Sequence, residues 1–252
     1  MKHLTDIKDL SAHDIEQLFE QANVFKTAHT NSTKQLHAGR SAMALFFENS
    51  TRTLTSFQLA CQRLGIDMVA LNIAHSSTQK GETIRDTLLT LDAMQSDLFI
   101  VRHQQNHIQQ DMINWLNNTT SIINAGDGTN QHPTQGLLDL YTIYQHKKDF
   151  KQLKVAIIGD IKHSRVANSL VDGLNIMGAG EVNLFAPDFL IPDNKQQLKA
   201  SCMKNCLQDA DVVVMLRIQK ERFTDKDQVS FEDWHQHYGL NEERLAIAKK
   251  DA

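Results

Sequence analysis

The chain has 252 residues, 41% of them hydrophobic, and its 26 basic and 30 acidic residues give a net charge of −4. This size allows one large domain or two small ones, and the mixed charge excludes any general reason to expect nucleic acid or an anionic membrane as a partner. The N-terminus lacks the apolar core of a signal peptide, and no stretch approaches about 18 uninterrupted apolar residues, so we expect no membrane span.

Strands and helices alternate along the first half of the chain. An opening helix, with Asp6 or Ser11 as its cap, is followed at 42–47 by a continuous apolar run, which is typical of a strand buried on both faces. The next helix follows Ser50 and is closed by Gly65, a residue type common at helix ends. The pattern continues with strands at 67–73, 98–101 and 121–124 and with helices at 81–93 and 112–116.

The second half repeats this alternation after a turn-rich stretch at 124–135. Such alternation predicts an α/β fold of two lobes, each a parallel sheet flanked by helices and doubly wound. We expect one domain at 1–135 and a second at 136–252, with ligands beyond the carboxyl ends of the strands. The predicted elements are helices at 136–146, which joins the lobes, and 164–177, and strands at 155–158, 182–185 and 212–216.

Ser50-Thr51-Arg52-Thr53 follow the first strand and begin a helix. A helix N-terminus offers N–H groups and a partial positive charge, and the hydroxyls and the arginine add further donors. This combination predicts a site for phosphate or a similar oxyanion. A plain Ser/Thr cap beside a surface arginine explains the same residues equally well. Arg102, directly after the strand at 98–101, either points toward the same crevice or is simply solvated.

Two polar loops carry further candidates. In His132-Pro133-Thr134-Gln135, the histidine and the glutamine can hydrogen-bond a carbonyl oxygen and an amide group, although a loop that only caps a helix is the alternative. On the loop at 75–83, Lys80 can close over an anionic ligand, and Thr78 or Ser77 is a candidate cap for the next helix.

The second lobe offers arginines rather than a nucleotide motif. Gly159-Asp160 resembles a Rossmann turn, but G-x-G-x-x-G is absent, so a dinucleotide site is poorly supported. Arg165 near a helix start and Arg217 after a strand suit carboxylates, and Gln219 faces the same way as Arg217 if that strand continues.

The sequence shows neither a metal cluster nor an activated nucleophile. Its three cysteines, Cys61, Cys202 and Cys206, leave an odd thiol and no second pair for zinc, so we expect reduced thiols. Cationic donors without a nucleophile indicate direct group transfer by positioning and electrostatics.

Six motifs, in order and spread over essentially the whole chain, resemble the catalytic chain of the aspartate carbamoyltransferase family. They are FFENSTRT, STQKGETIRDT, VRH, HPTQGLLDLYT, GDIKHSR and LRIQKER. The resemblance implies transfer of the carbamoyl group of carbamoyl phosphate to the α-amine of L-aspartate. The products would be N-carbamoyl-L-aspartate and phosphate, in de novo pyrimidine biosynthesis, with no metal or cofactor.

The resemblance also implies roles for individual residues. Arg52, Thr53, Arg102 and His132 would be catalytic, with His132 polarising the carbonyl and Gln135 holding the amide. The carbamoyl-phosphate ligands would be Ser50, Thr51, Arg52, Thr53, Arg102, His132 and Gln135, and the aspartate ligands would be Lys80, Arg165, Arg217 and Gln219.

The same resemblance implies a cytoplasmic homotrimer with active sites shared between subunits. Ser76 and Lys80 would lie on a loop that reaches into a neighbouring subunit's site, and Glu48 would pair with arginines as the domains close. Regulatory chains or a dihydroorotase remain open as partners.

Two other functions compete with this hypothesis. Ornithine carbamoyltransferases share the phosphate and His-Pro-x-Gln signatures, but ornithine needs an acidic partner where Arg217 supplies a cation. An inactive homologue acting as a regulator or scaffold should have lost phosphate ligands, and here they are all present.

The chain departs from the family pattern in two places. Leu54 replaces the arginine usual after Ser-Thr-Arg-Thr, outside the expected ligand shell. The chain ends at Ala252, whereas family members continue through a further loop and closing helices, so we expect an aspartate-binding domain that is incomplete at its C-terminus. The sequence would then be a fragment, or a short form whose activity an assay must decide.

Overall fold

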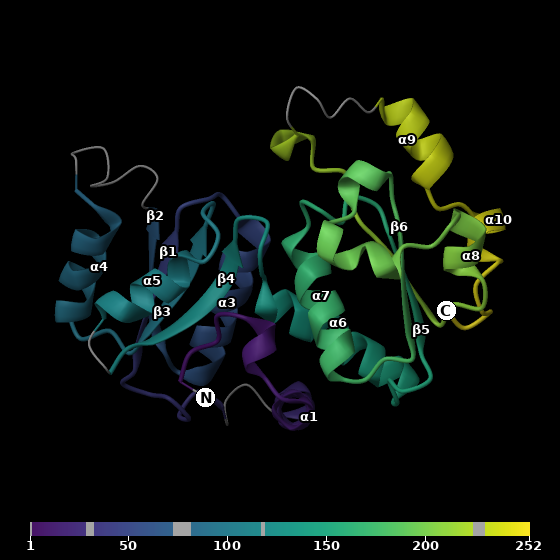
Figure 1. The fold of residues 1–252 in the computed structure, drawn as a ribbon. Coiled ribbons are helices and arrows are strands. Elements are labelled where there is room, and N and C mark those ends of the chain that lie inside the picture. The colour runs from purple at the N-terminus through teal and green to yellow at the C-terminus, as the bar shows by residue number, and fades with distance from the viewer. Residues whose placement is uncertain (1, 29–32, 73–81, 117–118, 224–229) are drawn as a thin grey trace. The chain divides into compact units, whose positions relative to one another are not determined.

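The computed structural model describes residues 2–28, 33–72, 82–116, 119–223 and 230–252, drawn in colour in Figure 1. The chain divides into two compact units, Met1–Thr134 and Gln135–Ala252. Each unit contains one parallel sheet covered by helices, so the predicted α/β class is confirmed. Among the described residues, no helix is long and apolar enough to cross a membrane.

Unit 1 alternates strands and helices as the sequence predicts. Its first helical segment is split, so that both candidate caps are used: Asp6 accepts a hydrogen bond at the start of a short 3₁₀ helix, and Ser11 caps α1 through a capping box with Asp14. The elements are η1 (Ile7–Asp9), α1 (Ala12–Thr27), β1 (Ser41–Phe46), α3 (Thr51–Leu64), β2 (Asp67–Asn72), α4 (Ile84–Ala93), β3 (Leu98–His103), α5 (Ile108–Trp115) and β4 (Ser121–Asp127).

The sheet of unit 1, called sheet A here, has the strand order β2-β1-β3-β4, with all strands parallel. Strand β1 is buried on both faces, as its apolar run predicts. Ala44 and Phe46 pack with Cys61 of α3 on one face, whereas Leu45 packs with residues of α4 and α5 on the other. Gly65 ends α3 in the left-handed conformation, with φ of 79°.

Unit 2 repeats the plan around a three-stranded parallel sheet, sheet B, with the order β6-β5-β7. Figure 1 shows α6 and α7 on one side of sheet B and α8 and α10 on the other. The elements are α6 (Pro133–Lys147, which begins in the last residues of unit 1), β5 (Lys154–Ile158), α7 (Arg165–Ile176), β6 (Glu181–Phe185), η4 (Asp188–Leu190), η5 (Asp193–Leu198), α8 (Met203–Leu207), β7 (Val212–Met215), η6 (Lys220–Arg222), α9 (Phe231–Tyr238) and α10 (Glu242–Leu245).

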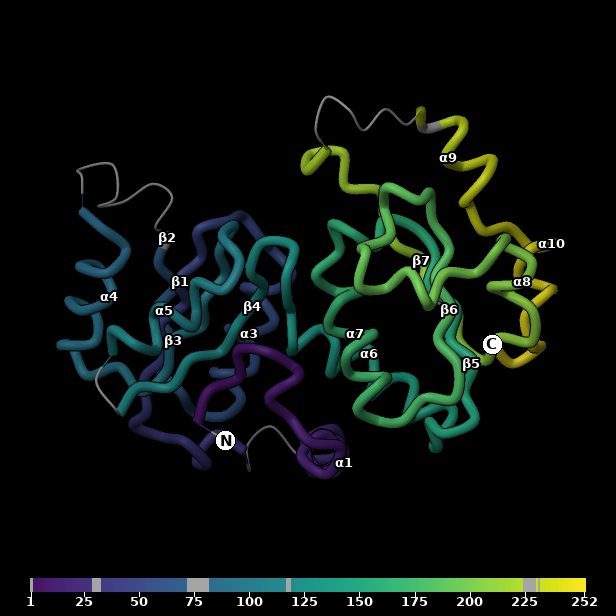
Figure 2. Tube along the Cα trace, in the orientation of Figure 1, coloured from purple at the N-terminus to yellow at the C-terminus, as the bar shows by residue number. Residues whose placement is uncertain are grey.

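Both sheets have a topological switch point, which can be followed along the chain trace in Figure 2. In sheet A, β1 lies between β2 and β3. The chain passes from β1 to its neighbour β2 on one side, and then crosses to β3 on the other side of β1. In sheet B, β5 lies between β6 and β7 in the same way. Crevices at the carboxyl ends of such strands are the usual ligand sites of open parallel sheets.

Several predicted boundaries are wrong. The helix expected over 81–93 starts at Ile84, and Thr83 is its cap rather than Thr78 or Ser77. Strand β3 runs through Arg102 instead of ending before it, and β7 ends at Met215, so the strand does not continue to Arg217. The helix expected from 136 starts at Pro133, because proline is well suited to the first helical position.

Candidate functional site

The carboxyl end of β1 leads directly into the helix that carries the predicted phosphate ligands. Ser50 is the N-cap of α3, and among the described residues its side chain accepts no capping hydrogen bond. Thr51 and Arg52 in the first turn are exposed, and Thr53 is half-buried. The first-turn N–H groups of a helix have no partner within the helix, so this helix start, with an exposed hydroxyl and an exposed guanidinium beside it, favours an anion.

Arg102 lies at the carboxyl end of β3, next to β1, and is held on two sides. Its Nε is 3.3 Å from Glu48 Oε2, and its Nη1 donates to the carbonyl oxygen of Ala125 at 3.2 Å. The Arg102 carbonyl oxygen accepts from Phe47 N at 2.9 Å. The guanidinium is therefore fixed at the switch point of sheet A, close to the residues that lead into α3.

A register shift in β4 helps to place Arg102. Val101 pairs with Asn124 but His103 pairs with Asp127, so β4 contains an extra residue between these pairs. Gly126 within this bulge has φ of 115°, a conformation that suits glycine. Bulges redirect neighbouring groups, and here the bulge presents the Ala125 carbonyl to the arginine.

The loop before His132 is built around one buried carboxylate, Asp127. Its Oδ2 accepts from His107 N at 2.7 Å and from Asn130 Nδ2 at 3.0 Å. Its Oδ1 accepts from Gln131 N at 2.9 Å and from Asn124 Nδ2 at 3.0 Å. Four donors satisfy this buried charge, so the loop that ends at His132 has a defined shape.

His132 follows this loop and immediately precedes α6. The ring is buried, and the Thr134 hydroxyl lies 3.3 Å from its Nδ1. Gln135 comes three residues after His132, in the first turn of α6, and its Nε2 donates to Asp139 Oδ1 at 2.9 Å. The helix start thus carries both members of the predicted His/Gln pair.

In unit 2, Asp160 organises the switch point of sheet B. This carboxylate is fully buried after β5, and its Oδ2 accepts from Gln219 N, in the segment after β7, at 3.0 Å. Its Oδ1 accepts from His163 N at 3.2 Å and lies 2.9 Å from His163 Nδ1. The two segments of unit 2 that carry predicted aspartate ligands are therefore tied together by Asp160.

Gly159 allows these segments to approach each other. Its φ is 125°, and a Cβ at this position would lie 2.3 Å from the Leu216 carbonyl oxygen. A side chain would push the end of β7 away from the end of β5, so glycine is required by both backbone conformation and space.

Arg217 and Arg165 differ in how they are held. The Arg217 side chain is 68% exposed. Its guanidinium forms a bidentate ion pair with Glu221, with Nη2–Oε1 at 2.5 Å and Nη1–Oε2 at 3.1 Å. The hydrogen bonds from Arg217 lower the pKa of Glu221 to about 2 and raise that of Arg217. Arg165 is instead buried, as the first residue of α7.

Ser76 and Lys80 lie outside the described residues. Among the described residues, no group of three or more His, Cys, Asp or Glu side chains could hold a metal ion.

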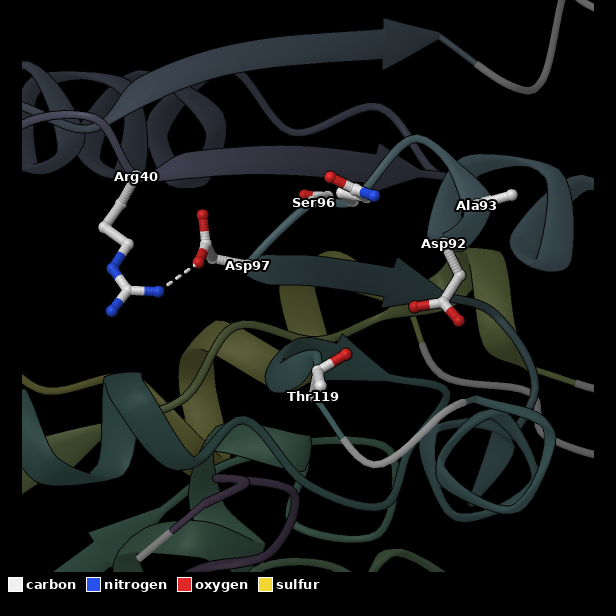
Figure 3. Close-up of a pocket in the computed structure, with 7 residues that line it drawn as sticks. Arg40, Asp92, Ala93, Ser96, Asp97 and Thr119 are labelled. Carbon is white, nitrogen blue, oxygen red and sulfur yellow. Dashed lines mark hydrogen bonds and ion pairs between the residues drawn. The ribbon is translucent and has the colours of Figure 1, made fainter.

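A cavity of about 740 Å³ lies elsewhere in unit 1, at the amino ends of the strands of sheet A. Figure 3 shows Arg40 and Asp97 at its rim, joined by an ion pair at 2.5 Å just before β1 and β3 begin. None of the predicted ligands lines this cavity. It lies at the edge of sheet A opposite to the switch point, away from the predicted ligands.

The residues that organise the site were not predicted from the sequence. Asp127, Asp160, Asp139 and Glu221 were given no role. The available signals were positional: an acid at the last residue of a strand (Asp127) or two residues after one (Asp160), and an i, i+4 spacing from a predicted ligand for the other two.

Comparison with known proteins places both units in one family. Residues 2–145 match the family described as aspartate/ornithine carbamoyltransferase, carbamoyl-P binding domain, and residues 151–252 match its Asp/Orn binding domain. The chain is 43% identical to the aspartate carbamoyltransferase catalytic subunit of Pelagibacter ubique (strain HTCC1062), over 100% of this chain and 81% of the relative.

Solved structures of aspartate transcarbamoylase from Trypanosoma cruzi have the same fold. The complex with carbamoyl aspartate and phosphate matches at a TM-score of 0.86 and 31% identity, covering 99% of this chain and 82% of that one. The complex with carbamoyl phosphate and aspartate matches at 0.86 and 30% identity, covering 99% and 83%.

Proposed function

The chain belongs to the aspartate/ornithine carbamoyltransferase family, and from this premise we propose that it transfers the carbamoyl group of carbamoyl phosphate to the α-amine of L-aspartate. The products are N-carbamoyl-L-aspartate and phosphate, and the reaction belongs to de novo pyrimidine synthesis. The chain is accordingly an aspartate carbamoyltransferase. Its similarity to a structure holding both substrates supports this choice.

One observation carries the proposal most directly. The neighbouring strands β1 and β3 end at a switch point, where the Arg102 guanidinium pairs with Glu48, a residue of the segment that leads from β1 into α3. A helix N-terminus with an exposed arginine suits the dianionic phosphate, and a second guanidinium beside it can reach the bridging or carbonyl oxygen.

We assign the donor substrate to residues around the start of α3 and α6. The phosphate group is bound by the helix N-terminus and hydroxyls of α3, by Arg52 and by Arg102. The carbonyl oxygen is polarised by Arg102 and His132, and the carbamoyl nitrogen is held by Gln135. The complete set is Ser50, Thr51, Arg52, Thr53, Arg102, His132 and Gln135.

The reaction then proceeds by direct attack. The deprotonated α-amine of aspartate forms a C–N bond to the carbamoyl carbon, and the carbonyl oxygen becomes an oxyanion. Arg52, Thr53, Arg102 and His132 stabilise that charge, because fixed donors gain strength as charge develops. The C–O bond to phosphate breaks, and a phosphate oxygen accepts the proton that the amine loses.

The acceptor substrate is assigned to unit 2. Arg165 and Arg217 bind the carboxylates of aspartate, and Gln219 adds a polar contact, with its backbone fixed by Asp160. A guanidinium at Arg217 repels the side-chain ammonium of ornithine, so aspartate is favoured over ornithine.

We further propose a cytoplasmic homotrimer in which Ser76 and Lys80 serve a neighbouring subunit's site. The three free cysteines fit a reducing compartment. Mixing Arg52→Ala with Lys80→Ala subunits tests the sharing. Each variant alone is expected to be inactive, and the mixture should regain activity through sites that combine two intact parts. A mixture as inactive as its components, with trimers present by sedimentation, would contradict sharing.

The reaction itself is tested with the purified protein. Carbamoyl phosphate and aspartate should give N-carbamoyl-L-aspartate and phosphate in equal amounts, whereas ornithine should give no citrulline. Absence of product with aspartate, in a protein shown to be folded by calorimetry, would overturn the proposed function. Citrulline formation would move the acceptor assignment to ornithine.

A further inference from the structure

Gln135 and Asp139 form a hydrogen-bonded pair on successive turns of α6. The Gln135 Nε2 donates to Asp139 Oδ1 at 2.9 Å, and both side chains are half-buried. The spacing of four residues places them on the same face of the helix. The pair lies wholly within unit 2, next to the start of α6.

The carboxylate decides which way the Gln135 amide is turned. An ionised carboxylate accepts hydrogen bonds but cannot donate them, so only the –NH₂ end of the amide can face Asp139. The Gln135 Oε1 must then point away from Asp139. A carbamoyl group ends in –NH₂, a donor that needs such an acceptor oxygen.

We propose that Asp139 is a positioning residue that acts through Gln135 to make the donor site select a carbamoyl nitrogen. The inference rests on the proposed function, which places the carbamoyl nitrogen at Gln135. The discrimination concerns acyl phosphates of the same shape and charge. Acetyl phosphate carries a methyl group where carbamoyl phosphate carries –NH₂, and a methyl group leaves the Gln135 oxygen without a donor. Leaving a buried acceptor unpaired is what makes such a site reject the analogue.

A pair that only stabilises the helix would explain the hydrogen bond but not the pKa of the Asp139 carboxyl. Burial raises the pKa of Asp139, although the hydrogen bond from Gln135 acts in the opposite direction. The folded state therefore disfavours this charge more than the bond favours it. A pair that only stabilised the helix should lower the pKa of the carboxyl instead, so the ionised Asp139 carries a cost in folding stability.

Selectivity between the two acyl phosphates is the direct test. In Asp139→Ala we expect the KM for carbamoyl phosphate to rise about tenfold, since one oriented hydrogen bond is lost. The inhibition constant of acetyl phosphate, competing with carbamoyl phosphate, should stay unchanged. The selectivity ratio then falls about tenfold, whereas a loosened helix would weaken both ligands alike.

Two variants guard the interpretation. Asp139→Asn keeps an acceptor oxygen but also offers a donor, so it permits both amide orientations and should lower the ratio about threefold. Tyr141→Phe is the matched control, because Tyr141 accepts a comparable hydrogen bond from Gln145 at 2.9 Å on the same helix. The control should leave the ratio at the wild-type value.

The outcomes distinguish a failure of the proposed function from a failure of the role proposed for Asp139. If the wild-type protein makes no N-carbamoyl-L-aspartate, the proposed function fails. If the wild type is active but a folded Asp139 variant keeps the wild-type ratio, the inference is overturned and the function stands. Removal of the amide in Gln135→Ala should abolish the effect of Asp139→Ala; an additive loss in the double variant would also overturn the inference.

Discussion

The carboxyl edges of sheets A and B use arginine in opposite ways. In sheet A, Arg102 lies inside a strand, is mostly buried, and is held by a backbone carbonyl and by Glu48. In sheet B, Arg217 lies beyond the end of β7, is largely exposed, and is held mainly by Glu221. One guanidinium is fixed by the sheet itself, whereas the other is held by a carboxylate four residues away.

This difference suggests how each of the two proposed substrates is bound. A fixed cation beside a helix N-terminus is prepared for phosphate before the ligand arrives, because its orientation has already been determined by the fold. Arg217 already binds the Glu221 carboxylate, the same chemical group that aspartate presents. We therefore expect donor binding to depend on rigid geometry and acceptor binding to depend on an exchange or sharing of carboxylates at Arg217.

The largest effect is expected at the fixed edge. Arg52→Ala removes a donor from the developing oxyanion and the leaving phosphate, and kcat should fall about a thousandfold. The aspartate KM should change far less. Steady-state kinetics with both substrates varied measures this split.

Arg63→Ala is the control for Arg52→Ala. Arg63 is an exposed arginine in the last turn of the same helix α3, so the two variants lose the same charge from the same element. Near-normal turnover in Arg52→Ala, or an equal loss in Arg63→Ala, would remove the start of α3 from the catalytic assignment.

The strands that build both edges could be predicted because they are short apolar runs. Residues 42–47 read as a strand buried on both faces, and β1 is packed on both. The end of β3 could not be read in the same way, since the apolar run stops at Val101 while the ladder continues to His103 across a bulge. Hydrophobicity cannot reveal pairing that a neighbouring strand imposes.

The role of the polar anchors was missed for a different reason. Asp127 and Asp160 look like ordinary loop acids, and their value comes from donors brought in from distant segments, such as His107 and Gln219. The short helix α10 of unit 2 was also missed. Segments of four or five residues are too short for a helical period, and tertiary packing determines them.

The exposed edge should respond more to the shape of the cation than to its charge. Arg217→Lys keeps the positive charge but loses the planar fork that binds a carboxylate with two parallel hydrogen bonds. We expect the aspartate KM to rise about 10- to 100-fold. The carbamoyl phosphate KM, measured in the same assay, should stay within about twofold and serves as the internal control. A change confined to the KM for carbamoyl phosphate would mean that Arg217 serves the donor substrate and not aspartate.

A smaller effect should separate stability from function at Asp139. Burial raises the pKa of Asp139 above its usual range in the folded protein, so the ionised form weakens the fold. Its contribution is neutral below the unfolded pKa and becomes unfavourable as pH rises through the folded pKa. Asp139→Asn should therefore gain about 1 kcal/mol at neutral pH and nothing at pH 3, by thermal unfolding followed across pH. Destabilisation at neutral pH would show that the carboxylate supports the helix instead.

The smallest effect is expected at the Arg217–Glu221 ion pair, although two side-chain hydrogen bonds make it look strong. Glu221 has a pKa lowered to about 2 by hydrogen bonds from Arg217, so its stabilising contribution is present above its unfolded pKa and is lost as pH falls toward 2. Both side chains are more than half exposed, and solvent and salt screen such pairs. Glu221→Gln should consequently lower stability by only about 0.5 kcal/mol or less at neutral pH, and added salt should shrink the difference further.

A loss well above that size in Glu221→Gln, insensitive to salt, would mean that Arg217 is fixed as firmly as Arg102. The contrast between the two edges would then disappear. Arg40, which is also exposed and paired with an acid at 2.5 Å, provides the reference, because Arg40→Gln removes a comparable surface ion pair far from either switch point. Similar small losses in Arg40→Gln and Glu221→Gln would place the Arg217–Glu221 pair among ordinary surface contacts. The guanidinium could then release Glu221 for a substrate carboxylate at little energetic cost.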